Sequence, residues 1–196
     1  NAIQAIEDSR FYKHIGVDPL GIARATFKNM LAGRTVEGGS TLTQQLTKIL
    51  FLSPERTFKR KIREAMIALQ IERMFSKEQI MEMYCNQIFL GGGAYGVEAG
   101  SQYYFGHSIR EATLEECAML AALPKAPSQY SPVLNPNDAK ERRNLVLRNM
   151  LEEKFIDQAT YDAAIAKPIV LNITSTTNTV SPNDSAFGYA VEEIRQ

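Results

Sequence analysis

Carboxylates in two segments of this sequence, Glu7–Asp8 and Glu64, could take part in proton transfer or help to hold a charged ligand. Glu7 and Asp8 are adjacent, near the end of a short helical segment, and Phe11 and His14 follow them closely. A Glu-Asp pair is most often a solvated helix end, and a lone histidine is most often a hydrogen-bonded structural residue. Taken alone, the residue types of this segment therefore favour a structural role over a functional one.

Glu64 lies in the most basic part of the chain, which comprises Arg56, Lys59, Arg60, Lys61 and Arg63. Arg60 and Lys61 precede Glu64 by four and three residues, so the three side chains share one face of a predicted helix. One interpretation is a solvated, salt-bridged face. The other is an anion site, because two cations beside one carboxylate could neutralise a diphosphate leaving group.

A third set of polar residues falls on a predicted helix over 41–50. Thr41, Gln45 and Lys48 are spaced i, i+4 and i+7, which places a hydroxyl, an amide and an ammonium group along one side. A structural helix would more often carry aliphatic residues at this spacing. The pattern therefore favours a ligand-binding face.

Other classes of site find little support in the sequence. His14 and His107 are the only histidines, and neither H-x-x-x-H nor C-x-x-C spacing occurs, which argues against a zinc site. The Gly91–Gly93 run lacks the G-x-G-x-x-G spacing of a dinucleotide site. Cys85 and Cys117 are the only cysteines, so a disulfide framework is excluded, although the sequence leaves open whether they pair.

Composition places the 196-residue chain among globular proteins, with 44% hydrophobic and 22% charged residues. The 22 basic and 22 acidic residues cancel, which argues against nucleic acid as the main partner. No apolar run reaches the roughly 18 residues of a membrane span. Because the chain starts at Asn1 inside an apolar-periodic segment, we expect it to be excised from a longer protein.

Hydrophobic spacing and capping residues predict a mostly α protein. Asp18 and Pro19 are typical of a helix start, and Gly33 is typical of its end. One strand is expected over 168–173, and residues 174–184 are expected to be weakly structured. The predicted helices cover 2–7, 19–32, 41–50, 54–74, 76–86, 95–104, 113–123, 137–153 and 158–166.

Five segments, in chain order, resemble the five motifs of one family. The resemblance is to the peptidoglycan glycosyltransferase domain (glycosyltransferase family 51) of class A penicillin-binding proteins and monofunctional transglycosylases, and it spans residues 7–132. The segments are EDSRFYKH at 7–14, GGSTLTQQLTK at 38–48, RKIRE at 60–64, YCN at 84–86 with LG at 90–91 and YGV at 95–97, and LAALPKAPS at 120–128 with YSP at 130–132. Departures from the family pattern are Glu37, Ile49 and Cys85, and they leave both glutamate positions intact.

The resemblance implies a lysozyme-like, mostly α domain over residues 1–186, with a larger head lobe and a small jaw lobe that dips into the membrane. The jaw would cover roughly residues 19–35, where Leu20, Ile22, Phe27, Met30 and Leu31 supply apolar surface. Residues 187–196 resemble the start of a connection to a C-terminal transpeptidase domain in the parent chain.

The activity implied is polymerisation of lipid II into glycan strands, by inverting β-1,4 transfer with loss of undecaprenyl diphosphate. Glu7 would be the general base for the acceptor hydroxyl, and Glu64, Lys61, Lys48 and Gln45 would hold and neutralise the donor diphosphate. The other expected substrate contacts are Asp8, Phe11, His14, Ser40, Thr41, Gln44, Arg60, Asn86, Lys125 and Ser128.

The expected partners and location also follow from the resemblance. The partners are lipid II, the growing glycan strand, the membrane surface and moenomycin-type inhibitors, with no nucleic acid. The location is the outer face of the bacterial cytoplasmic membrane, where an N-terminal helix outside this chain would be the anchor. No cofactor is demanded, although a divalent cation (Mg²⁺ or Mn²⁺) could assist at the diphosphate.

Two alternative functions deserve comparison with this one. A lysozyme-like hydrolase also needs paired carboxylates but transfers the sugar to water, and it has no diphosphate that would need cations such as Lys48 and Lys61. A helical nucleic-acid-binding module could use the basic residues of 56–63. Against that module stand the net charge of zero and the single aromatic residue of the cluster, Phe58.

Overall fold

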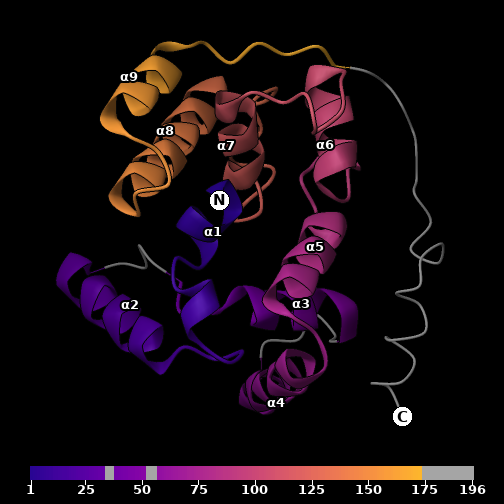
Figure 1. Ribbon diagram of the computed structural model, residues 1–196, viewed down its shortest axis with the longest axis vertical. Coiled ribbons are helices and arrows are strands. Elements are labelled where there is room, and N and C mark those ends of the chain that lie inside the picture. Colours follow the sequence, from indigo (N-terminus) through magenta and orange to yellow (C-terminus); the bar gives the residue numbers. More distant parts are fainter. Residues whose placement is uncertain (34–37, 52–56, 174–196) are drawn as a thin grey trace.

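The computed structural model describes residues 1–33, 38–51 and 57–173, and nearly all of the regular secondary structure in these ranges is helical (Figure 1). The prediction of a mostly α protein is confirmed. The helices are α1 (Ala2–Glu7), α2 (Pro19–Ala32), α3 (Leu42–Phe51), α4 (Phe58–Met74), α5 (Lys77–Gln87), α6 (Val97–Phe105), α7 (Leu114–Ala122), α8 (Pro136–Glu152) and α9 (Gln158–Ala166), with a 3₁₀ turn, η1, at Phe11–Lys13.

Local signals explain where these helices begin and end. Pro19 occupies the first turn of α2, and Gly33 ends it in the left-handed region at φ 62°. Ser76 and Gln79 form a reciprocal capping box at the start of α5. The helix start predicted at residue 54 lies outside the described residues.

The helix predicted over 95–104 begins two residues later, at Val97. Tyr95 pairs with Phe89 in an isolated antiparallel bridge, which keeps the backbone extended at that point. Gly96 then takes φ 83°, a conformation that a right-handed helix does not allow. Helical periodicity could not reveal this bridge, because it depends on a contact across the glycine-rich loop.

The strand predicted over 168–173 is wrong, since none of the described residues in this segment belongs to a strand. The segment instead runs past α6, where the Asn172 backbone N–H donates to the Tyr104 carbonyl at 2.9 Å. Ile169 and Leu171 pack against the hydrophobic core. Its apolar residues are thus used for packing on helices, and no neighbouring strand pairs with it. The predicted segments 174–184 and 187–196 lie outside the described residues.

Helix α7 forms the centre of the core. It packs against α1, α6, α8 and α9, and its residues Ala118–Ala122 are all buried. Figure 1 shows α1, α7, α8 and α9 toward one end of the molecule and α2, α3 and α4 toward the other, with α5 between them. Since α1 belongs to the first group, the residues at its C-terminal end lie where the two groups meet.

Helix α2 differs from the other long helices because only Ala25 of its fourteen residues is buried. Its exposed large apolar side chains are those of Leu20, Ile22, Phe27, Met30 and Leu31. This helix covers most of the predicted jaw, while residues 34 and 35 lie outside the described ranges. The division into head and jaw lobes stays a prediction.

Candidate active site

One cavity of about 680 Å³ opens where the end of α1 meets the beginnings of α3 and α4 and the loop before α8. It brings together most of the predicted site residues, although they come from separate segments of the chain. Those lining it are Glu7, Asp8, Ser40, Thr41, Gln44, Gln45, Lys48, Arg60, Lys61, Glu64 and Lys125.

Four predicted site residues do not line this cavity. Phe11 is 0% exposed in the core, and the Lys77 Nζ lies 4.4 Å from its ring centroid. His14 is buried behind Asp8, with which it shares a hydrogen bond. Asn86 and Ser128 are exposed and lie outside the lining. The structure therefore does not bring these four side chains to the cavity.

Glu7, the last residue of α1, is partly buried, and its Oε2 accepts a hydrogen bond from Gln45 Nε2 at 2.9 Å. Burial raises the pKa of Glu7, because a desolvated carboxylate favours the neutral form. The Gln45 hydrogen bond and the charges of Arg142 and Lys125 oppose this rise, and Asp8 adds to it. Glu7 is thus a carboxylate with an increased affinity for a proton, as a general base requires.

Gln45 lines the cavity between Glu7 and Tyr84. Its amide NH₂ faces Glu7, and its Oε1 accepts from the Tyr84 hydroxyl at 3.1 Å. Burial raises the pKa of Tyr84 well above its usual value, so the hydroxyl keeps its proton and donates it to the amide. Tyr84 therefore fixes the amide orientation in which Gln45 donates to Glu7. The sequence analysis expected Gln45 as a diphosphate ligand; in the structure its amide NH₂ is engaged with Glu7, and the ligand role stays a prediction.

A second charged group forms at the start of α4. Glu64 is only 3% exposed, Arg60 Nη1 donates to its Oε2 at 2.8 Å, and Lys61 Nζ donates to its Oε1. Lys61 also donates to Ser40 Oγ at 2.8 Å, which ties α4 to the segment before α3. The shared face predicted from the i+3 and i+4 spacing is confirmed. With exposed Lys48 on the same cavity, cations outnumber carboxylates here, as an anion site requires.

A family model for transglycosylases matches residues 1–151. This chain belongs to the transglycosylase family. It is 56% identical to penicillin-binding protein 1A of Aquifex aeolicus over 171 residues, which are 87% of this chain and 24% of that protein. It is 47% identical to penicillin-binding protein 1A of Neisseria cinerea over 196 residues, which are 100% of this chain and 24% of that protein.

Among solved structures, the crystal structure of penicillin-binding protein 1A from Haemophilus influenzae is 36% identical. The match covers 78% of this chain and 19% of that one, with a TM-score of 0.49. The transglycosylase chain thus spans about a quarter of the length of the curated relatives that it matches.

Helix α8 adds residues to the transglycosylase cavity that the sequence analysis missed, foremost Arg142 and Asn149. Arg142 is 8% exposed, its guanidinium carbon lies 5.4 Å from the Tyr130 ring centroid, and its Nε has no hydrogen-bond partner among the described residues. A sequence signal existed, because Arg142 falls three residues after Ala139 and four before Val146, both of them buried. An arginine at a core-facing helical position is a candidate ligand contact.

Thr41 and Gln44 line the transglycosylase cavity but also form the start of α3. Thr41 Oγ1 accepts from the Gln44 backbone N–H at 3.1 Å, and Gln44 Oε1 accepts from the Thr41 N–H at 3.0 Å. This reciprocal pair is a capping box. The two residues therefore fix the position of the helix that carries Gln45 and Lys48.

Within the described ranges, no three or more His, Cys, Asp or Glu side chains gather in a group that could hold a metal ion. The divalent cation expected at the diphosphate stays a prediction. Cys85 and Cys117 are both free, and burial raises the pKa of each thiol. None of the helices in those ranges is long and apolar enough to cross a membrane.

Proposed function

We propose that this transglycosylase polymerises lipid II into β-1,4-linked glycan strands and releases undecaprenyl diphosphate. The observation that carries the proposal is the pairing, in one cavity, of a proton-accepting carboxylate, Glu7, with the Arg60–Lys61–Glu64 group. A glycan hydrolase would need carboxylates but no such cationic group, because its leaving group carries no diphosphate.

Glu7 would remove the proton from the 4-hydroxyl of the acceptor sugar as that oxygen attacks the donor carbon. Gln45, itself held by Tyr84, keeps the Glu7 carboxylate in place for this transfer. Because an α-linked donor gives a β-linked product, one in-line displacement without a glycosyl-enzyme is expected. The proton then resides on Glu7, and the electron pair of the broken bond leaves with the diphosphate.

The donor diphosphate would bind between α3 and α4. Lys61 and Arg60 lie on either side of the Glu64 carboxylate, and Lys48 adds a third cation from α3. These charges stabilise the negative charge that develops on the leaving group. A divalent cation could share the phosphate oxygens, although the described residues form no cluster of His, Cys, Asp or Glu side chains that demands one.

The acceptor would lie against the other wall of the cavity, where Lys125 and Arg142 are found. A lipid-linked acceptor also carries phosphate, and the partnerless Nε of buried Arg142 is a donor that such a group could satisfy. Both cations lower the pKa of Glu7, so they lie close enough to influence the base. Moenomycin-type inhibitors are expected to compete for the phosphate contacts.

The lipid tails of both substrates would stay in the bilayer, and α2 is the element suited to meet it. Its exposed apolar residues stand beside Arg24 and Lys28, a combination typical of interfacial helices. We therefore place the domain at the outer face of the cytoplasmic membrane. The parent chain would supply an N-terminal anchor and a C-terminal transpeptidase domain.

The proposal is tested by incubating the protein with labelled lipid II in detergent and separating the products. We expect glycan polymers that a muramidase digests, together with undecaprenyl diphosphate in equal number to the bonds formed. The Glu7→Gln variant serves as the control for contaminating activity. Shortening of a preformed glycan, without any polymer from lipid II, would support the hydrolase alternative.

A further inference from the structure

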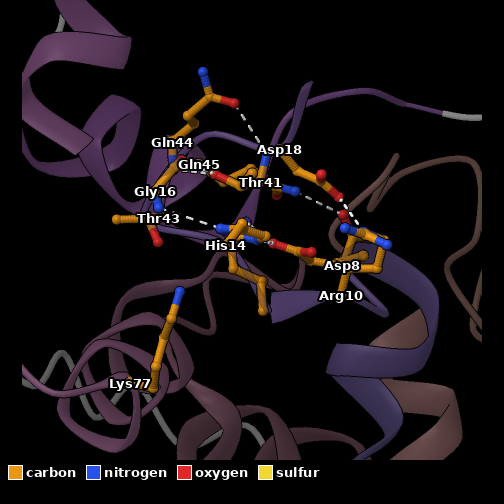
Figure 2. A network of polar contacts seen from close by, with 12 residues as sticks. Asp8, Arg10, His14, Gly16, Asp18, Thr41, Thr43, Gln44, Gln45 and Lys77 are labelled. Atoms are coloured by element: carbon orange, nitrogen blue, oxygen red, sulfur yellow. Dashed lines mark hydrogen bonds and ion pairs between the residues drawn. The ribbon is translucent and has the colours of Figure 1, made fainter. Parts of the chain in front are cut away.

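We propose that His14 is a positioning residue for the Glu7–Asp8 segment, acting as a neutral imidazole with its proton on Nε2, and that it does not contact substrate. The proposal rests on the proposed function for its effect on turnover. The protonation state follows from the hydrogen bonds of the ring and does not depend on that function. Figure 2 shows the network that surrounds the ring.

The backbone of Gly16 determines which ring nitrogen of His14 carries the proton. The Gly16 N–H points at His14 Nδ1, with an N···N distance of 3.2 Å. Since an amide N–H can only donate, Nδ1 must offer its lone pair, and in the neutral ring the proton then sits on Nε2. His14 Nε2 lies 2.9 Å from Asp8 Oδ2, so the N–H donates to the carboxylate. In a doubly protonated ring, the Nδ1–H of His14 would point at the N–H of Gly16, and these two donors could not form a hydrogen bond.

The Gly16 backbone packs closely against α4, and both of its polar groups form hydrogen bonds. Its φ is 96°, and a Cβ at this position would lie 2.8 Å from the Ala68 carbonyl oxygen of α4. Its own carbonyl accepts a hydrogen bond from Thr41 Oγ1 at 2.6 Å. Both backbone polar groups of Gly16 are therefore committed, one to His14 and one to the capping residue of α3.

Asp8 connects His14 to the catalytic elements. The same oxygen, Oδ2, that accepts from His14 also accepts from the Leu42 backbone N–H, at 3.0 Å. Leu42 is the first residue of α3, whose N-terminal N–H groups have no partner within the helix. The His14–Asp8 pair therefore holds the end of α1 against the start of α3.

This connection acts on the base, because Glu7 directly precedes Asp8 and accepts from Gln45 on α3. The side chains of His14 and Asp8 are 3% and 6% exposed, so water cannot easily replace the bond between them. Loss of the imidazole would leave a buried carboxylate with one donor fewer and would loosen α1 against α3. Since both ring nitrogens are engaged and the ring does not line the cavity, His14 has no group left for a ligand.

The protonation state can be measured directly, because the chain has only two histidines. In protein labelled with ¹⁵N on histidine only, at the pH at which it polymerises lipid II, the imidazole nitrogens are recorded by NMR. His107→Gln removes the other histidine and assigns the spectrum. We expect a protonated Nε2 and an unprotonated Nδ1 for His14. A proton on Nδ1, or on both nitrogens, would overturn the proposal.

The positioning role is tested by kinetics on two His14 variants and two matched His107 variants. His14→Phe should lower kcat about 10²-fold, as expected for a small displacement of a catalytic group, while KM changes by less than about threefold. His14→Gln can still donate to Asp8 from a similar position and should retain at least about tenfold more activity than His14→Phe. The His107 ring stacks on Phe105 and does not line the cavity, so His107→Phe and His107→Gln should keep the original kcat.

Equal kcat values for His14→Gln and His14→Phe, or an unchanged kcat in His14→Phe, would overturn the proposal. If His14→Phe does not fold, the NMR measurement and the His14→Gln variant decide. A wild-type protein that shows the expected protonation state but does not polymerise lipid II would contradict the proposed function and not this arrangement of bonds.

Discussion

Glu7 is a single residue under opposing influences. Burial and the neighbouring Asp8 raise its pKa, while Gln45, Arg142 and Lys125 restrain the rise. A glutamate with a raised pKa takes up a proton more readily than an exposed glutamate. It can act as a base only at a pH at which it is ionised before the reaction. The residues that restrain the rise therefore decide how far activity extends toward acid pH.

Gln45→Leu should move the acid limb of the kcat/KM profile to higher pH. The Gln45 hydrogen bond favours the ionised form of Glu7, so its loss raises the pKa of Glu7 further and protonates the base at a higher pH. The measurement is lipid II polymerisation across pH, with Gln70→Leu, an exposed position on α4, as the control. An acid limb that stays in place would show that Gln45 does not tune the base.

Lys61→Ala tests whether the ion pair on α4 serves catalysis or stability. The Lys61 side chain is 42% exposed, and Arg60 still pairs with the buried Glu64 carboxylate after its removal, so the free energy of unfolding should change by no more than about 1 kcal/mol. Turnover should nevertheless fall about 10²-fold, because one charge that stabilises the leaving diphosphate is lost. Lys59→Ala, exposed on the same helix, is the control. A large loss of stability with a matching loss of activity would indicate a structural salt bridge instead.

At the scale of elements, the site lies where the C-terminal end of α1 and the N-terminal ends of α3 and α4 come together. The last residue of α1 is Glu7, the proposed base, a capping box starts α3, and the first turns of α4 carry the cations. Helix ends offer backbone groups without partners, and here side chains such as that of Asp8 satisfy them. At the site, α1, α3 and α4 are therefore joined by hydrogen bonds of a few polar side chains and of the Gly16 backbone.

Gly16→Ala should destabilise the protein by about 1–3 kcal/mol and lower turnover as well, because it combines a strained φ with a clash. The new Cβ would lie 2.8 Å from the Ala68 carbonyl oxygen, which is backbone and cannot move aside cheaply. Gly33→Ala, also at positive φ but with no atom within 4 Å, isolates the cost of the dihedral angle. Equal losses in thermal denaturation for the two variants would mean that the close approach at Gly16 has no effect.

The elements and the local charge pairs were largely predictable from the sequence. Proline, glycine and capping residues mark most helix ends, and the Arg60–Lys61–Glu64 face follows from i+3 and i+4 spacing alone. The strand predicted over 168–173 is wrong, because β-branched residues suit helix packing as well as a sheet and only a partner strand distinguishes the two.

The parts of the site that depend on folding were not predictable. The contact of Gln45 with Tyr84 joins residues 39 positions apart, and the approach of Arg142 to Glu7 brings α8 to α1. The spacing of residues within one helix cannot predict contacts between residues so far apart in the sequence. The family resemblance implied substrate contacts for His14 and Phe11, and the structure finds both buried away from the cavity.

At the scale of the whole molecule, α2 should bring the protein to the membrane surface. Replacing Phe27 and Leu31 by serine together should weaken binding to anionic liposomes, because both side chains are exposed and would lie in the interface. Leu134→Ser removes an exposed apolar group elsewhere and should leave binding unchanged. Cosedimentation measures the effect. Retention of full binding by the double variant would show that α2 is not the membrane contact.

Polymerisation of lipid II by Glu7→Gln tests the central claim most directly. Glutamine keeps the shape of the side chain and can still accept from Gln45, but it cannot take a proton. We predict a rate about 10²–10⁴-fold below wild type, with binding of a moenomycin-type inhibitor largely retained. Because the folded-state pKa of Glu7 is raised, its contribution to stability is present below the unfolded-state pKa and lost as pH rises through the folded-state value. Thermal stability at neutral pH should therefore not fall. Polymerisation at the wild-type rate would contradict the role of Glu7 as the base.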